Sequence, residues 1–237
     1  NIFMVQNRKS YCLNILRQQI LSLALEPGSD LDETKLGQEF GISRTPLREV
    51  LQKLAGEGYV DLTQNKGAKV VSMDLGTMRT FFQTAPLIYA NIARLAAENR
   101  TIQQLDKLKQ AQFAFTSATR GSDPAQSAIH NHSFHQIIGD MAENLYLKPS
   151  LDRMLIDHTR LSQTFYRPTS TQEAVLVTKA CDQHDALISA IEARETNLAI
   201  DLTLQHWDLS LDRLERFVHP EPLSFNITSL QEKKHAI

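Results

Sequence analysis

The eight histidines of this chain all lie after residue 129, and three of them have a spacing that suits a metal site. His135 stands four residues after Asn131 in a segment with helical period, so the two side chains project from one helix face. His184 and His206 lie on consecutive predicted helices, and residue 195, midway between them, falls in the break between those helices. In an antiparallel hairpin both imidazoles then lie at one height, roughly 16 Å from the turn. If both face the helix of His135, three imidazoles converge, which is typical of a divalent-metal site and favours zinc or nickel.

The same histidines have a plainer interpretation. A single histidine on a helix is more often a core or surface residue than a ligand, and matched height alone leaves this alternative open. His132 is a second possible ligand, because it precedes His135 by three residues, although Asn131 has the better facing angle. We interpret His130 and His158 as surface residues or as neighbours of the site.

A second group of polar residues has a pattern typical of DNA reading. A predicted helix over 32–40, a turn at Gly41 and a predicted helix over 44–57 give the order of a helix-turn-helix, whose second helix enters the major groove with its N-terminal end. Arg44 and Arg48 share a face there, and arginine bonds a guanine edge or a phosphate. The alternative is a solvated helix face. The candidate DNA contacts are Ser43, Arg44, Thr45 and Arg48 on this helix, with Lys66 and Gly67 at the tip of the following hairpin.

The elements that would position these two groups form two units. In the first unit, apolar spacing and turn residues predict helices over 11–25, 32–40 and 44–57 and strands over 59–63 and 68–72. In the second unit, helical period predicts helices near 75–99, 101–119, 124–142, 147–165, 171–194 and 196–217. The expected fold is therefore mainly α. An N-terminal winged helix-turn-helix over 8–73 precedes an all-helical antiparallel bundle of about six helices over 75–218, and 219–237 form a loose tail.

Composition narrows the function classes. The 237 residues hold 25 Lys and Arg against 27 Asp and Glu, so bulk basic charge cannot drive nucleic-acid binding, although a local basic face can. No apolar run approaches the roughly 18 residues of a membrane span. Two distant cysteines, Cys12 and Cys181, exclude a disulfide framework and a cysteine-rich zinc site. With no secretory signal in view, we expect a cytoplasmic protein without a membrane partner.

Residues 27–72 resemble the winged helix of the GntR superfamily of bacterial transcription regulators, most specifically in the run SRTPLREVLQKLAGEGYV. The helical remainder is similar to the effector domain of the FadR-like branch, the FCD domain. That domain has the pattern D-x-x-F-H and one histidine on each of its last two long helices. This chain has Asn131-His132-Ser133-Phe134-His135, then His184 and His206. The resemblance implies DNA contact by the residues above and a metal held by Asn131 and the three histidines.

Three departures from the family pattern bear on specificity. Thr34 stands where many members have an arginine that reads DNA. Asn131 replaces an aspartate, so the metal site loses an anionic ligand. Ala85 and Tyr89 stand where members often have arginine and glutamate, which implies a different effector pocket.

The resemblance also implies a small-molecule effector, commonly a carboxylate that contacts the metal with help from cationic or polar side chains. The candidates here are Tyr89, Arg153 and Arg160. For the two arginines the alternative is a solvent-facing position.

We therefore expect a transcription regulator and not an enzyme. Its partners would be double-stranded operator DNA, a small effector, and a second copy of the chain, because two reading helices need half-sites about one helical turn apart. Two alternatives stay open. One is a regulator with a metal-free ligand pocket. The other is a metal-dependent hydrolase that activates water, which the histidine motifs disfavour because none carries a carboxylate placed as general base.

Overall fold

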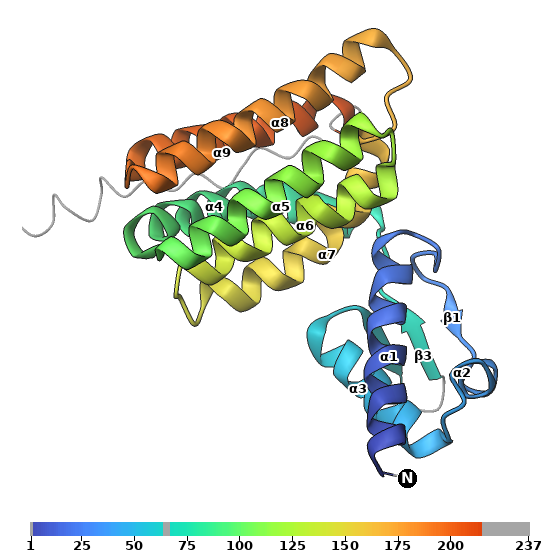
Figure 1. Cartoon of the computed structure of the whole chain (residues 1–237). Helices are drawn as coiled ribbons and strands as arrows, with labels where there is room; N and C mark the ends of the chain where they lie inside the picture. The colour runs from blue at the N-terminus through green and yellow to red at the C-terminus, as the bar shows by residue number, and fades with distance from the viewer. Residues whose placement is uncertain (1, 64–66, 215–237) are drawn as a thin grey trace, which may run out of the picture.

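The computed structural model describes residues 2–63 and 67–214, with side chains from residue 7 to residue 209 outside the gap. Figure 1 shows a small N-terminal module beside a larger helical bundle. The N-terminal module consists of α1 (Ile2–Leu21), β1 (Asp30–Leu31), α2 (Glu33–Phe40), α3 (Arg44–Glu57), β2 (Val60–Thr63) and β3 (Gly67–Val70). The bundle consists of α4 (Leu75–Asn99), α5 (Ile102–Arg120), α6 (Pro124–Met141), α7 (Leu147–Phe165), α8 (Thr171–Glu192) and α9 (Thr196–Leu214). The expected tail over 219–237 lies outside the described residues.

Local signals set the turn between α2 and α3. The Asp32 carboxylate caps α2 by accepting from the backbone N–H groups of Thr34 and Lys35. Gly41 ends the helix with φ 60°, a left-handed conformation that glycine adopts without a steric penalty. Ser43 is extended at the start of α3. The chain thereby reverses out of α2 within a few residues, and the N-terminal end of α3 stays exposed.

The three strands form one antiparallel sheet in the order β1-β3-β2. Val60 pairs with Val70 and Thr63 with Gly67, which is the predicted hairpin. Strand β1 was not predicted, because its two residues have no period and are set by pairing of Asp30 with Lys69. Helix α1 also differs from the predicted span over 11–25: it begins at Ile2 and ends at Leu21, and Leu23 then turns the chain with φ 64°.

The first five helices of the bundle match the predicted spans within two residues, and α9 begins at Thr196 as predicted, while its predicted end at residue 217 lies outside the described residues. Helix α4 is central, since it packs against α6, α7, α8 and α9. Its buried side chains include Phe81, Phe82, Tyr89 and Ile92, which join the main apolar core. Pro86 lies inside α4 and lacks the N–H that would bond the carbonyl of Phe82. No helix in the described part of the chain is long and apolar enough to span a membrane.

Helix α7 joins the two modules. Ile156 packs into the core of the N-terminal module. The fully buried Arg160 donates from Nη1 to the carbonyl of Val71 (2.7 Å) and pairs with Asp157. Gln163 Nε2 donates to the carbonyl of Leu21, 3.1 Å away. The N-terminal module is therefore held by directed bonds to one face of α7.

Candidate metal centre and DNA-reading surface

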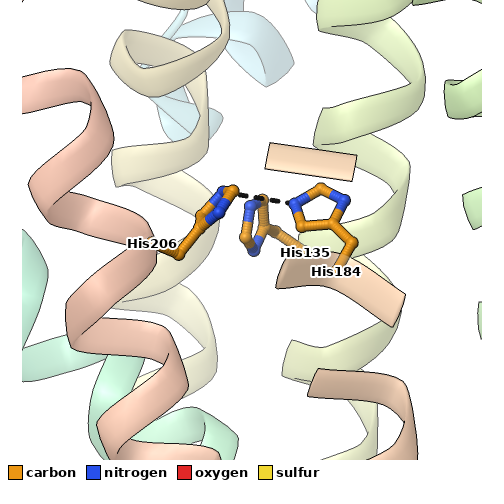
Figure 2. A group of neighbouring side chains, drawn as sticks. All are labelled: His135, His184 and His206. Atoms are coloured by element: carbon orange, nitrogen blue, oxygen red, sulfur yellow. Dashed lines mark hydrogen bonds between the residues drawn. The ribbon is translucent and has the colours of Figure 1, made fainter. Parts of the chain in front are cut away.

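Three histidines from three helices converge in the bundle. His135 on α6, His184 on α8 and His206 on α9 each offer a ring nitrogen, and these atoms lie within 4.8 Å of one another. Figure 2 shows the three imidazoles turned toward one another. His135 and His184 are buried, and His206 is partly buried. The convergence expected from the sequence is thus present, with the two hairpin histidines at one height.

Two glutamines fix the orientation of the hairpin histidines. His184 Nδ1 lies 3.0 Å from Gln112 Oε1, and His206 Nδ1 lies 3.0 Å from Gln183 Oε1. The amide of Gln112 is set independently, because its Nε2 donates to the Cys181 carbonyl and to Asp185. An amide oxygen only accepts, so Nδ1 of each imidazole donates and Nε2 keeps its lone pair. Such bonding of the remote nitrogen is usual for histidines that bind a metal.

The two Nε2 atoms face each other. His184 Nε2 and His206 Nε2 are 3.2 Å apart. Burial, with the neighbouring His206 and His158 adding to it, lowers the pKa of His184 well below its usual value, and burial lowers the pKa of His206 to about 4. At neutral pH both rings are therefore uncharged, and two lone pairs meet without a proton between them. A cation is the natural bridge.

Two further buried atoms fit the same interpretation. Asn131 Oδ1 and His135 Nε2 have no hydrogen-bond partner among the described residues. Burial, followed by the nearby His158, His184 and His206, keeps the pKa of His135 well below its usual range. Buried acceptors without partners are costly unless a cation or donor satisfies them. Three neutral imidazoles within 4.8 Å of one another therefore fit a divalent metal such as zinc, and the Asn131 oxygen, one helix turn before His135, is the candidate for a further donor.

A fourth histidine, His158 on α7, borders this centre. Its ring centroid is 5.1 Å from that of His135, and its Nδ1 lies 2.9 Å from the Tyr89 hydroxyl. Sequence reasoning left it as a surface residue or a neighbour of the site, and the structure places it as a neighbour. The apolar residues Leu151 and Leu155 of α7 are buried, and His158 follows them at helical spacing, so this pattern could have predicted an inward position. Tyr89 itself is buried with its ring 5.3 Å from His135.

The structure does not bring Arg153 and Arg160 to the histidines. Both lie on the face of α7 that meets the N-terminal module, where Arg160 bonds Val71 and Arg153 pairs with Asp157. The expectation that these two arginines contact the effector is not supported, because the helical period shows which positions share a face but not which module that face meets. His132 is likewise turned away, with Nδ1 2.8 Å from Thr159 Oγ1.

A small pocket adjoins the centre. His206 and His158 both line it, and its volume is about 30 Å³. The remaining walls come from α4, α7 and α9 and from the residue after α7. They are Phe81, Phe82, Leu161, Ser162, Phe165, Tyr166, Trp207 and Leu209.

The predicted DNA contacts of α3 share one exposed surface. Ser43, Arg44, Thr45 and Arg48 are all exposed, and Arg44 and Arg48 line a groove of about 500 Å³ with Gly67 of the hairpin. Lys66 lies outside the described residues. Sequence reasoning missed Glu33, whose Oε2 is 3.9 Å from Nε of both arginines. This carboxylate in the first turn of α2 lies beside the two guanidinium groups, which stay exposed.

Comparison with known proteins covers both modules. Residues 13–70 match the profile of bacterial regulatory proteins of the gntR family, and residues 83–209 match the FCD domain. The chain is 22% identical to the uncharacterized HTH-type transcriptional regulator YdhC of Bacillus subtilis, over 85% of this chain and 88% of that protein. It is 24% identical to the HTH-type transcriptional repressor RspR of Escherichia coli, over 81% and 82%.

Solved structures show the same architecture. The fold matches Escherichia coli McbR/YncC with a TM-score of 0.73 at 19% identity, covering 88% of this chain and 97% of that one. It matches a putative GntR transcriptional regulator from Rhodococcus with a TM-score of 0.65 at 15% identity, covering 90% and 100%.

Proposed function

The chain belongs to the GntR family of bacterial transcription regulators and carries an FCD domain, and from this premise we propose that a small carboxylate bound at a divalent metal ion in the bundle controls its affinity for operator DNA. It is a regulator and not an enzyme, as are the proteins it resembles. We further propose that it acts as a cytoplasmic homodimer. The winged helix would span residues 8–73 and the effector domain residues 75–218.

The observation that supports the metal most strongly is the pair of Nε2 atoms of His184 and His206, 3.2 Å apart, each on a ring whose Nδ1 faces a glutamine oxygen. Asn131 Oδ1 and the His135 ring would complete the donor set. A bound divalent cation would offer Lewis acidity to an anionic oxygen of the effector. Because Asn131 is neutral, such a site holds its metal less tightly than one with an anionic ligand.

On the DNA side, Arg44 and Arg48 supply two exposed guanidinium groups at the N-terminal end of α3, where a reading helix contacts base edges. Ser43 and Thr45 would add hydroxyl contacts, and Gly67 would let the hairpin approach the backbone closely. Lys66 is proposed from the sequence as the phosphate contact of the wing.

Helix α7 offers a physical route between the two sites. One face carries His158 and Leu161, which line the pocket beside the metal centre. Another face carries Arg160, which pairs with Asp157 and donates to the carbonyl of Val71 in the linker to the N-terminal module. A ligand that shifts or rotates α7 would therefore change the position of the reading helix. By linkage, DNA would then change effector affinity by the same factor.

The test is a duplex titration with sites that the zinc-loaded protein selects from a random DNA library. We expect Arg44→Ala and Arg48→Ala each to weaken binding by about tenfold or more, roughly 1–3 kcal/mol. We expect removal of zinc to change the affinity of the wild-type protein. Glu39→Gln, an exposed change on α2, serves as the control. Unchanged affinity in both arginine variants would overturn the DNA-reading assignment, and indifference to zinc would overturn the proposed control by metal.

A further inference from the structure

The pocket beside the histidines has an unusual wall for a site that would take a carboxylate. Phe81 and Phe82 come from α4, Phe165 from α7 and Trp207 from α9, Leu161 and Leu209 add aliphatic side chains, and Tyr166 adds a ring with a hydroxyl. The rings pack edge to face, with Phe81 5.6 Å from Trp207 and 5.2 Å from Phe82. Among the residues that the structure describes, no lysine or arginine lines this space.

The polar groups of the wall are few, and among the described lining residues none is a lysine or arginine side chain. They belong to Ser162, Tyr166, Trp207 and the two histidines. Ser162 Oγ donates to the carbonyl of His158 at 2.7 Å, His206 Nδ1 faces Gln183, and His158 Nδ1 faces the Tyr89 hydroxyl. A second carboxylate on a ligand would therefore enter a space without a cationic side chain, and a body with many hydroxyls would outnumber the polar groups of the wall. Burying a charge or a polar group without a partner is costly in apolar surroundings.

Resting on the proposed function, we infer that the effector of this chain is a short monocarboxylate with a mainly apolar body: its carboxylate meets the metal held by the histidines and its body fills the aromatic pocket. The same wall disfavours dicarboxylates, because it has no cationic side chain, and sugar acids, because it has few polar groups. The class of effector follows from two neighbouring surfaces, the metal centre and the aromatic pocket, and His206 belongs to both.

The volume of the pocket adds a condition. About 30 Å³ holds roughly two water molecules, so the body of the ligand must displace part of the wall. The first turns of α4 are the place where this is easiest, because Pro86 removes the helix bond to the Phe82 carbonyl. Phe81 and Phe82 lie between that weak point and the linker near Asp74, so entry of the ligand would move the segment that leads to the N-terminal module.

The chain supplies its own reporter. Trp207 is the only tryptophan in the sequence, and it lies in the pocket wall. Zinc-loaded protein is titrated with butyrate, benzoate, malonate and gluconate while Trp207 emission is followed. We expect saturable changes with butyrate or benzoate and at least about tenfold weaker binding of malonate and gluconate. Phe82→Ala, which enlarges the pocket, is expected to favour benzoate over butyrate, whereas Phe113→Ala, at an exposed position on α5, leaves the preference unchanged.

Zinc content and DNA affinity are measured on the same samples. Equal or tighter binding of malonate or gluconate overturns the inference, and so does the absence of any saturable response at millimolar concentrations in protein that holds zinc and binds DNA. Protein that takes up no zinc overturns the proposed function instead. The two failures are therefore distinguishable.

Discussion

His184 and His206 present their Nε2 atoms to each other at 3.2 Å, while the other nitrogen of each ring faces a glutamine oxygen. In a buried setting this leaves two lone pairs in contact. The arrangement is unfavourable in the protein alone and favourable around a cation, which makes the pair the most informative feature of the bundle.

The first concerns Gln112, which holds His184 by its Nδ1 atom. Gln112→Leu removes the acceptor and leaves the ring free to place its proton on Nε2. We expect zinc affinity to fall by about 10–100-fold, as for other partners of metal-bound histidines. A competition titration with a chromophoric chelator measures this. Gln136→Leu, at an exposed position on α6, is the matched control, and equal affinities in the two variants would contradict the role of Gln112.

The second concerns Asn131. Asn131→Asp adds a carboxylate beside the histidines, so we expect zinc to bind more tightly, on the order of tenfold or about 1.4 kcal/mol. In metal-free protein the same carboxylate is buried without a partner, so the free energy of unfolding should fall. Urea unfolding with and without zinc checks both signs. A variant that is equally destabilised in both conditions would show that residue 131 does not face the metal.

The third is a pH dependence of the metal-free protein. Burial lowers the pKa of His158 to about 3 and of His206 to about 4, and lowers those of His135 and His184 as well. An unfolded histidine titrates near pH 6.5, so below that pH the unfolded chain binds protons that the folded chain does not. Stability is therefore full above about pH 6.5 and is lost as the pH falls toward the folded pKa values, at up to about 1.4 kcal/mol per pH unit for each histidine.

Urea unfolding of the metal-free protein at pH 7 and pH 5 measures this loss, since most carboxylates stay ionised over that interval. His206→Gln should show a shallower dependence than the wild type. His130→Gln is the control, because His130 lies outside the cluster. A stability that does not change between the two pH values would mean that the histidines are not buried in the neutral form.

The fourth concerns the link between the modules. Arg160→Met with Asp157→Asn removes the buried ion pair and the bond to the Val71 carbonyl without leaving a lone buried charge. We expect the double variant to fold, to keep its zinc and to lose the response of DNA affinity to zinc. Anisotropy titrations with and without chelator give the ratio of the two affinities. A ratio equal to that of the wild type would exclude this bond as the route.

The sequence predicts most of this architecture because its signals are local. Asp32 and Gly41 bound α2, and the apolar period predicts the ends of α4 to α8 and the start of α9 within two residues. The equal distance of His184 and His206 from the break at residue 195 predicts that they face each other in the helical hairpin, because their height depends only on the helical rise. Strand β1 was not predicted from the sequence, because its two residues are too few to show a period and pair only in the folded sheet.

Side-chain partners depend on packing between elements that are distant in the sequence, so the hydrogen-bond partners could not be predicted. The role of Gln112 depends on the contact of α5 with α8, and that of Arg160 on the face of α7 that meets the linker. The aromatic pocket gathers residues from α4, α7 and α9, which no motif connects. The departures at Ala85 and Tyr89 indicated only that the pocket would differ from its relatives.

The central claim is that the three histidines hold a metal, and the most direct measurement is the metal content of untagged protein that has never met a chelator, by elemental mass spectrometry. The account predicts roughly one zinc or nickel ion per chain, absent from His184→Ala and retained in His130→Gln. A content near zero that added zinc cannot raise, in protein that is folded and binds DNA, would contradict it and leave a metal-free pocket as the regulatory site.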